Sequence, residues 1–224
     1  MDPDSGVTSV TSGQSPVVPS APPAARLVFG DRIGQAEAYA GLLAGPGVVR
    51  GLIGPREVPR LWDRHILNSA AIAELVPWPS ALIDLGSGAG LPGIVLALLL
   101  PDVSVTLLER MARRTEFLRE CVRELGLSNV EVVEAQAEEA AGRLTADVIT
   151  ARAVAPLVRL APLALALVRP GGLVLAIKGA GAERELAVAR RVLRRLRVRD
   201  AGVIAAGGGK VDQAATVIRL IAGP

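Results

Sequence analysis

The sequence has few of the features that several protein classes require. Its single cysteine excludes an internal disulfide bond and a cysteine-rich metal site, and we expect no bound metal ion. Cys121 falls on one helical stripe with Phe117 and Leu125, so we expect it in the core. The longest apolar run, residues 94–100, is far shorter than the roughly 18 residues that a membrane span needs. Disulfide scaffolds and membrane-spanning proteins are therefore excluded as classes.

The amino-terminal segment lacks the pattern of a signal peptide, because its start, Met-Asp-Pro-Asp, has neither a basic nor a hydrophobic region. We therefore expect a cytoplasmic protein that does not contact a membrane. Residues 1–25 are rich in Ser, Pro, Thr and Gly without hydrophobic periodicity, which predicts a disordered tail. Aromatic residues make up only 2% of the chain, so an extended surface for stacking bases is not expected.

Positive charge slightly exceeds negative charge, since 25 Lys and Arg residues stand against 22 Asp and Glu residues. This excess is compatible with ordinary solubility and with an anionic partner such as RNA. Two arginine clusters have the same two interpretations, a solvated surface or a set of phosphate contacts. One consists of Arg50, Arg56, Arg60 and Arg64, and the other of Arg190, Arg191, Arg194, Arg195, Arg197 and Arg199.

The most informative segment is residues 81–93, Ala-Leu-Ile-Asp-Leu-Gly-Ser-Gly-Ala-Gly-Leu-Pro-Gly. Its apolar start is typical of a buried strand, and Gly86, Gly88 and Gly90 permit a sharp turn with bare backbone. Pro92 suits the first position of a following helix, whose amino terminus would face the loop. A strand, a glycine loop and a helix in this order predict a site for a nucleoside-bearing ligand.

Spacing selects among such ligands. The dinucleotide pattern G-x-G-x-x-G is not met, since Leu91 stands where the third glycine belongs, and no Gly-Lys-Ser/Thr of a P-loop follows. The remaining pattern, Asp84-x-Gly-x-Gly-x-Gly, resembles the first motif of Rossmann-like methyltransferases that use S-adenosylmethionine. Glu109 ends the next apolar run, 19 residues after Gly90, where it is placed to accept hydrogen bonds from a ribose diol.

The order of elements predicts an α/β fold, because β-type runs alternate with helical segments as in a parallel sheet wound on both faces. We expect an amino-terminal helical cap at residues 26–78 and a Rossmann-like core at residues 79–224. Helices in the cap are predicted at residues 31–44 and 59–76. The core elements are seven strands at residues 81–85, 103–108, 130–134, 147–151, 172–177, 197–204 and 215–221, and helices at residues 92–100, 112–125, 155–168 and 182–195.

The carboxyl ends of these strands should form the site, since ligands of an open parallel sheet bind there. Glycines and polar or charged residues follow the first five predicted strands. In strand order they are Asp84, Gly86, Gly88 and Gly90; Glu109; Gln136, Ala137 and Glu138; Arg152; and Lys178. Their concentration at the strand ends predicts a cofactor crevice.

The acceptor can be narrowed by elimination. Methylation of pyrimidine C5 needs a cysteine nucleophile after the fourth strand, and exocyclic-amine methyltransferases typically carry Asp/Asn-Pro-Pro-Tyr/Phe there. Neither occurs, since that position reads Ala-Arg-Ala-Val from residue 151. A ring nitrogen such as guanine N7 needs only positioning and a nearby donor, which Arg152 and Lys178 could supply. Ring-nitrogen methylation is favoured, although elimination does not prove it.

Several short motifs occur in an order that resembles one family, the RsmG (glucose-inhibited division protein B) guanine-N7 methyltransferases of bacterial small-subunit rRNA. The resemblance covers roughly residues 55–180. The motifs are Arg64-His65-Ile-Leu-Asn-Ser69, Asp84 to Gly93, Thr106-Leu-Leu-Glu109, Arg113-Arg114-Thr-Glu-Phe-Leu118, Ala137-Glu138, Ala151-Arg152-Ala153 and Ala176-Ile-Lys-Gly179. One departure is Asn68, where the family usually has Asp.

The resemblance implies S-adenosyl-L-methionine as cofactor and in-line methyl transfer to guanine N7 at one position of a conserved 16S rRNA loop. It implies cofactor contacts at Gly86, Leu91, Ala137, Glu138 and Arg152, in addition to Asp84, Gly88, Gly90 and Glu109 from the loop pattern. Arg152, Lys178 and His65 are the predicted catalytic residues. Because N7 needs no deprotonation, His65 is expected to position groups rather than act as a base. We expect a monomer whose partner is 16S rRNA or the small ribosomal subunit.

Three other functions remain open on the residues alone. A small-molecule methyltransferase would have a closed apolar pocket and no salt-sensitive RNA binding. A non-catalytic module would bind S-adenosylmethionine without turnover, against which Arg152 and Lys178 argue. A nicotinamide oxidoreductase is disfavoured by Leu91.

Overall fold

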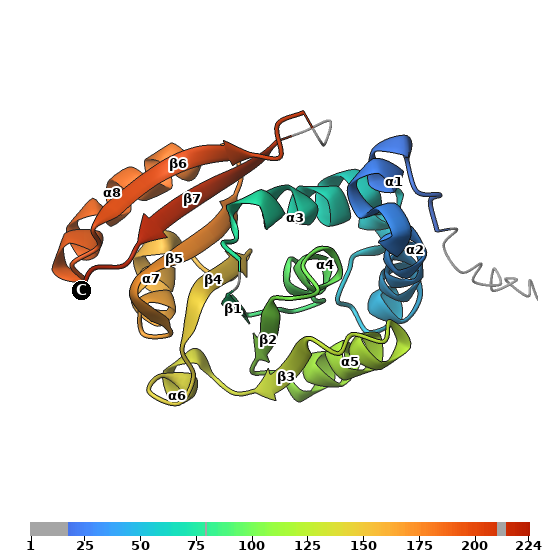
Figure 1. Ribbon diagram of the computed structural model, residues 1–224, viewed down its shortest axis with the longest axis horizontal. Coiled ribbons are helices and arrows are strands. Elements are labelled where there is room, and N and C mark those ends of the chain that lie inside the picture. The colour runs from blue at the N-terminus through green and yellow to red at the C-terminus, as the bar shows by residue number, and fades with distance from the viewer. Residues whose placement is uncertain (1–17, 79, 210–213) are drawn as a thin grey trace, which may run out of the picture.

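The computed structural model describes residues 18–78, 80–209 and 214–224, and its centre is a seven-stranded sheet (Figure 1). The strand order is β3-β2-β1-β4-β5-β7-β6, in which β7 is antiparallel to both neighbours and the other pairs are parallel. The strands are β1 (Ala81–Leu85), β2 (Ser104–Glu109), β3 (Val130–Glu134), β4 (Ala146–Arg152), β5 (Val168–Lys178), β6 (Asp200–Ala206) and β7 (Ala215–Ile221). The predicted fold class is confirmed.

Helices cover both faces of the sheet (Figure 1). The helical cap, α4 and α5 pack on one face, and α6, α7 and α8 pack on the other. The helices are α1 (Pro23–Phe29), α2 (Ile33–Leu42), α3 (Asn68–Ala70), α4 (Gly93–Leu99), α5 (Ala112–Glu124), α6 (Ala137–Ala140), α7 (Leu157–Leu165) and α8 (Ala182–Arg195). Short 3-10 or π-helical segments of the cap are η1 (Gly30–Arg32), η2 (Leu43–Gly47), η3 (Pro55–Arg60), η4 (Leu61–Leu67) and η5 (Ala71–Leu75).

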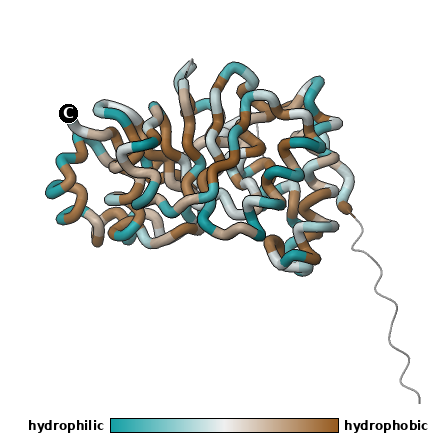
Figure 2. The backbone as a smooth tube through the Cα atoms, turned by 90° about the horizontal axis from the view of Figure 1, so that it is seen from below, coloured by the Kyte–Doolittle hydropathy of each residue, from teal (hydrophilic) through white to brown (hydrophobic). Residues whose placement is uncertain are grey.

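Two hydrophobic cores lie on the two faces of the sheet. The central strand β1 is buried from Leu82 to Leu85, as expected for a strand with helices on both sides. Figure 2 shows hydrophobic chain running through the middle of the molecule and hydrophilic chain at many of the outer turns. None of the described helices has the length and apolar composition that crossing a bilayer requires.

The helical cap differs from the prediction in detail. α1 begins at Pro23, inside the segment predicted to be a tail, and residues 1–17 of that segment lie outside the described residues. The helix predicted at residues 59–76 is a helical path through η3, η4, α3 and η5. Pro59 lies inside η3 and has no backbone N–H to donate, which disfavours regular α-helical winding there.

Several boundaries in the core also differ. β5 begins at Val168, four residues before its predicted start, because Val168 pairs with Ala146 at the beginning of β4. α7 accordingly ends at Leu165. β6 begins at Asp200, three residues later than predicted, because the chain first turns tightly at Arg197. The connection between β6 and β7 lies partly outside the described residues, since residues 210–213 are not described.

Candidate functional site

The glycine loop after β1 turns as sharply as the sequence predicts. Gly86, Gly88 and Gly90 have φ angles of 67°, 60° and 96°, which residues with a side chain rarely adopt. A Cβ atom on Gly86 would lie 2.9 Å from Cγ2 of Val154, and one on Gly90 would lie 2.9 Å from Oη of Tyr39. Space as well as backbone angle therefore requires glycine at both positions.

Asp84 fixes the position of this loop through hydrogen bonds to its carboxylate. Its Oδ1 accepts a hydrogen bond from Thr150 Oγ1 (2.9 Å), and its Oδ2 accepts from Ser87 Oγ (2.6 Å) and from Gly93 N (3.0 Å). Burial raises the pKa of the fully buried Asp84 carboxyl, and these three hydrogen bonds oppose that rise. The sequence predicts a cofactor contact for Asp84, but the structure assigns its carboxylate to fixing the start and end of the loop.

Tyr39 of α2 connects the helical cap to the same loop. Its fully buried hydroxyl donates a hydrogen bond to the carbonyl oxygen of Ala89 (2.7 Å). Burial raises the pKa of Tyr39, so its phenol stays protonated and remains a donor. The cap therefore sets the position of the loop through a specific polar contact.

A cavity of about 570 Å³ opens beside the loop at the carboxyl ends of β1, β2 and β4. This volume lies in the range of sites that enclose a cofactor-sized ligand. Five charged residues are among those that line it, so the cavity is not purely apolar. The lining residues are Leu85, Gly86, Leu108, Glu109, Arg110, Arg114, Ala135, Gln136, Ala137, Glu138, Ala153, Val154, Ala155, Arg159 and Leu163.

Glu109 lies at the tip of β2 on the cavity wall and is only 4% exposed. Its Oε2 accepts a hydrogen bond from Gly88 N (3.1 Å), and its Oε1 accepts one from Met111 N (3.0 Å). Arg114 Nη1 lies 3.5 Å from Oε2. The carboxylate is thus held in place beside the glycine loop, where the remaining lone pairs of its oxygens suit the hydroxyl groups of a ribose.

The start of α6 forms the next part of the wall. Gln136 precedes this helix as part of a capping box, in which its backbone N–H donates to Glu139 Oε2 (3.1 Å). The cap fixes where α6 begins, and Ala137 and Glu138 therefore line the cavity. The small side chain of Ala137 leaves room at this wall.

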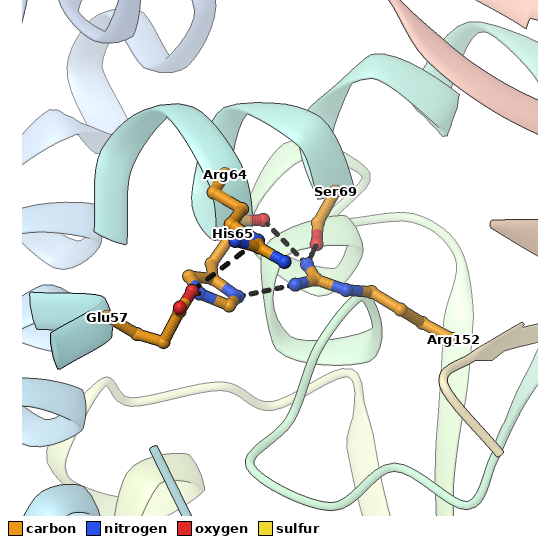
Figure 3. A network of polar contacts seen from close by, with 5 residues as sticks. All are labelled: Glu57, Arg64, His65, Ser69 and Arg152. Carbon is orange, nitrogen blue, oxygen red and sulfur yellow. Dashed lines mark hydrogen bonds and ion pairs between the residues drawn. The ribbon is translucent and has the colours of Figure 1, made fainter. Parts of the chain in front are cut away.

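Arg152 at the end of β4 is bound to the helical cap rather than left free (Figure 3). Its Nη1 donates to the carbonyl oxygen of His65 (3.2 Å) and to Ser69 Oγ (3.2 Å), and its Nη2 donates to Nδ1 of His65. Nε2 of His65 contacts Oε2 of Glu57 at 2.8 Å. Glu57, His65 and Arg152 therefore form a continuous chain from η3 to the strand end, with Arg64 beside it.

The geometry fixes the tautomer of His65. A guanidinium only donates, so Nδ1 must be the acceptor of the neutral ring, and the proton lies on Nε2, which donates to Glu57. Burial and the charge of Arg152 lower the pKa of His65, which favours this neutral form. His65 is therefore suited to orienting Arg152 and poorly suited to carrying a proton to substrate.

Lys178 lies on the other side of the sheet from Arg152. Arg152 pairs in register with Ile177, so the next residue of β5 directs its side chain to the opposite face. Lys178 Nζ donates to the carbonyl oxygen of Ala155 (2.9 Å) and contacts Glu185 Oε1 of α8 at 2.7 Å. The sequence predicts both Arg152 and Lys178 as catalytic residues, but the structure does not bring their charged groups together.

Known proteins are similar to this chain over most of its length. A family model described as rRNA small subunit methyltransferase G matches residues 32–212. A ribosomal RNA small subunit methyltransferase G from Thermobifida fusca is 59% identical over 204 residues, 91% of this chain and 85% of that protein. The protein of the same name from Mycolicibacterium smegmatis is 52% identical, covering 90% of this chain and 86% of its own length.

The chain belongs to the rRNA small subunit methyltransferase G family. This confirms the family that the sequence motifs resemble. Solved structures agree on the fold alone: a methyltransferase from Pyrococcus furiosus aligns with a TM-score of 0.54 and 19% identity, covering 71% of this chain and 83% of that chain. A SAM-dependent O-methyltransferase from Thermotoga maritima aligns with a TM-score of 0.53 and 17% identity, covering 75% of this chain and 70% of that chain.

In this methyltransferase G family member the predicted site residues fall into three groups. Gly86, Glu109, Ala137 and Glu138 line the cavity. Asp84, Gly88, Gly90, Leu91 and Arg152 do not line it. Gly88, Gly90 and Leu91 belong to the loop, Asp84 fixes the loop by hydrogen bonds, and Arg152 joins the end of β4 to the cap. Of the three predicted catalytic residues, His65 and Arg152 are in direct contact and Lys178 is apart.

The sequence does not predict three residues that hold other groups of the site in place. Glu57 orients His65, Tyr39 holds the glycine loop, and Glu185 pairs with Lys178. No local motif marks them, because each makes its contact across a long stretch of chain or between separate elements. Among the described residues, no group of three or more His, Cys, Asp or Glu side chains is arranged to hold a metal ion.

Proposed function

We propose that this chain transfers a methyl group from S-adenosyl-L-methionine to N7 of one guanine in 16S rRNA. The observation that carries the proposal is the cavity at the strand ends, which has the Glu109 carboxylate on one wall and the loop after Arg152 on the other. Membership of the rRNA small subunit methyltransferase G family supports an rRNA substrate.

The residues present fit this cofactor. Glu109 offers carboxylate oxygens for a ribose diol, and Ala137 and Glu138 leave an open wall at the start of α6. Gly86 lines the cavity without a side chain, so bare backbone faces the ligand there. A Cβ atom at this position would contact Val154. When bound there, S-adenosyl-L-methionine supplies an electrophilic methyl group, which is the chemistry that the protein itself lacks.

The chain itself must position the guanine relative to the methyl group of the cofactor. The N7 lone pair of guanine lies in the plane of the ring and needs no general base, so the acceptor must be aligned and water excluded. Arg152 does not line the cavity but directly precedes Ala153, which does. The cap fixes the orientation of its cation, which suits an acceptor oxygen or a phosphate of the RNA. His65 and Glu57 orient Arg152, and Lys178 orients the 153–156 loop.

The competing small-molecule methyltransferase is not favoured, because charged side chains line the cavity instead of a closed apolar surface. We further propose that the partner is 16S rRNA within the small ribosomal subunit, that the chain acts as a monomer, and that it acts in the cytoplasm. The rRNA methyltransferase family supports the partner and the compartment in this proposal.

The test uses cofactor with a labelled methyl group and three substrates: naked rRNA, intact small subunits and a panel of small molecules. The RNA is then cleaved with borohydride and aniline, which break the strand at N7-methylguanine. Label in RNA that maps to one cleaved guanine supports the proposal. Label only in small molecules, or binding without transfer to any substrate, contradicts it.

A further inference from the structure

The end of α8 carries a concentration of positive charge that the proposed active site does not use. From residue 186 to residue 199 the chain has six arginines and no Asp or Glu. All six are exposed, and among the described residues none forms an ion pair, since the adjacent Asp200 pairs with Arg219 at 2.7 Å. They are Arg190, Arg191, Arg194, Arg195, Arg197 and Arg199.

Part of this cluster borders a groove of about 250 Å³ between α8 and the start of β6. Arg190, Arg194 and Arg199 line it, together with Asp200, whose carboxylate pairs with Arg219. The other lining residues are the apolar Leu186, Leu193, Val198 and Ala201. We call this surface, together with Arg197 next to the lining residue Val198, the α8 arginine groove. Guanidinium groups around a concave surface are suited to phosphate, which they bind with paired, charge-assisted hydrogen bonds.

The groove lies away from the methyl-transfer cavity. β5 and β6 are both antiparallel to β7, so they run in the same direction. Asp200 at the start of β6 therefore lies at the opposite end of the strands from Arg152, which ends β4. The first turn of α8 contacts Lys178 near the cavity, while the arginines occupy its last turns. At a rise of roughly 1.5 Å per residue, Arg190 and Arg194 lie about 7 Å and about 13 Å beyond Glu185 along the helix axis.

The backbone at Arg197 indicates more than a solvated helix end. Val198 N donates to Leu193 O (3.0 Å) and Arg197 N donates to Arg194 O (3.1 Å), which is the pattern of a Schellman turn. The position of Arg197 in that turn favours glycine, yet Arg197 occupies it with φ of 55°. A left-handed conformation costs a non-glycine residue about 1–2 kcal/mol.

Interaction with the helix dipole does not account for an arginine instead of a glycine at position 197. A cation at a helix carboxyl end gains about 0.3–1 kcal/mol on an exposed surface, which is less than the conformational cost. The gain also falls off within the last turn, whereas Arg199 lies beyond it. Retaining a cation at Arg197 at a net cost to stability points to a partner outside the chain.

We propose that the α8 arginine groove binds backbone phosphates of the rRNA at the opposite end of the strands from the methyl-transfer cavity. This inference rests on the proposed rRNA substrate. Contacts to phosphate carry no sequence information, so the groove adds affinity and orients the RNA while the cavity selects the base. The groove contributes to substrate affinity and leaves the methyl-transfer step itself unchanged.

The test measures the affinity for small subunits, or for rRNA, against salt concentration. Each phosphate contact contributes about 0.7–0.9 to the slope of log affinity against log salt. The variant Arg190→Ala/Arg194→Ala/Arg199→Ala should lower the slope by about 2–3, with turnover at saturating substrate unchanged. The matched control is Arg32→Ala/Arg123→Ala/Arg143→Ala, which removes the same charge from exposed positions elsewhere and should change the slope little.

A second variant separates binding from folding. Arg197→Gly relieves the backbone strain, so it should unfold at an equal or higher temperature than the parent while binding RNA more weakly. A groove variant with the same salt slope as the control, or an Arg197→Gly variant with parental affinity, overturns the inference. Failure of the parent protein to methylate any RNA would contradict the proposed function instead, so the two failures are distinguishable.

Discussion

Arg152 Nη2 donates a hydrogen bond to His65 Nδ1, and this contact joins the end of β4 to the helical cap. The cap is therefore part of the candidate active site and not only a cover for one face of the sheet. Because Arg152 only donates, the contact exists only while His65 is neutral. Glu57 supports that state from the other ring nitrogen. Several measurable consequences follow from this arrangement.

The tautomer of His65 can be observed directly, because the chain contains one histidine. Nitrogen NMR of the ring should show a protonated Nε2 and an unprotonated Nδ1. Glu57→Leu removes the acceptor of the Nε2 proton and should leave the ring less firmly oriented, with turnover lowered by roughly tenfold, as for a displaced positioning group. A protonated Nδ1 in the parent protein would contradict the hydrogen-bond assignment.

The same contact predicts a dependence on pH. The pKa of His65 is lowered in the folded state, so the unfolded chain binds the proton first as pH falls below about 6.5. The stability from the neutral ring is complete above that pH and is lost as pH falls toward the folded pKa. His65→Asn keeps an acceptor near Arg152 but cannot titrate. Melting temperatures at about pH 7.5 and pH 5.5 should therefore converge in this variant, and an undiminished difference would exclude His65 as its source.

Arg152→Lys tests whether orientation or charge is required. Lysine retains the cation but cannot donate at once to His65 Nδ1, the His65 carbonyl and Ser69 Oγ with a planar group. We expect turnover to fall by about 10²-fold, with a smaller change in cofactor affinity. Ser69→Ala is the control, since it removes one of the three contacts and should cost less. Equal turnover in Arg152→Lys and the parent would leave Arg152 with no orienting role.

Two glycines of the loop give a matched pair for the packing argument. Both have positive φ, but only Gly90→Ala places a Cβ against Ile94 and Tyr39, whereas Gly88→Ala meets nothing closer than 3.8 Å. Gly88→Ala should cost about 1–2 kcal/mol of unfolding free energy, and Gly90→Ala should cost about 1–3 kcal/mol more. Denaturant titrations and cofactor affinity check this order. Equal losses of unfolding free energy in the two variants would show that the backbone strain alone, and not the contact with Ile94 and Tyr39, sets the cost.

Lys178 and Glu185 are predicted to act as a structural pair. Glu185 Oε1 accepts from both Lys178 Nζ (2.7 Å) and Leu157 N (2.5 Å), which ties β5 and the start of α7 to α8. Lys178→Met or Glu185→Gln alone leaves a partly buried group without its partner. A double-mutant cycle should therefore show about 0.5–3 kcal/mol of coupling in stability. Coupling near zero, with lost turnover in Lys178→Met alone, would return Lys178 to a direct role in catalysis.

The fold could be predicted because its signals are local. Most of the seven strands contain a short apolar run, and the spacing of the glycine loop differs from the dinucleotide and P-loop patterns. Boundaries were less certain, since they depend on pairing between distant segments. Val168 enters β5 because of Ala146, and the start of β6 depends on a turn at Arg197 that composition does not mark.

The site could be predicted only as a set of strand ends. The sequence predicts Glu109, Ala137 and Glu138 at one crevice, and in the structure all three line the same cavity. The sequence does not assign directions to side chains, so it predicts both Arg152 and Lys178 as catalytic although they face opposite sides of the sheet. Asp84 was expected at the ligand, but its environment is set by Ser87, Gly93 and Thr150, which meet only in three dimensions.

The most direct test of the central claim is the position of the methyl group on the RNA. Small subunits from cells that lack this protein are incubated with the purified chain and labelled cofactor, and the 16S rRNA is cleaved with borohydride and aniline. The account predicts label at one guanine, cleavage at that guanine, and neither with Arg152→Ala. Label on another base or another atom, or no label in any RNA, would contradict it.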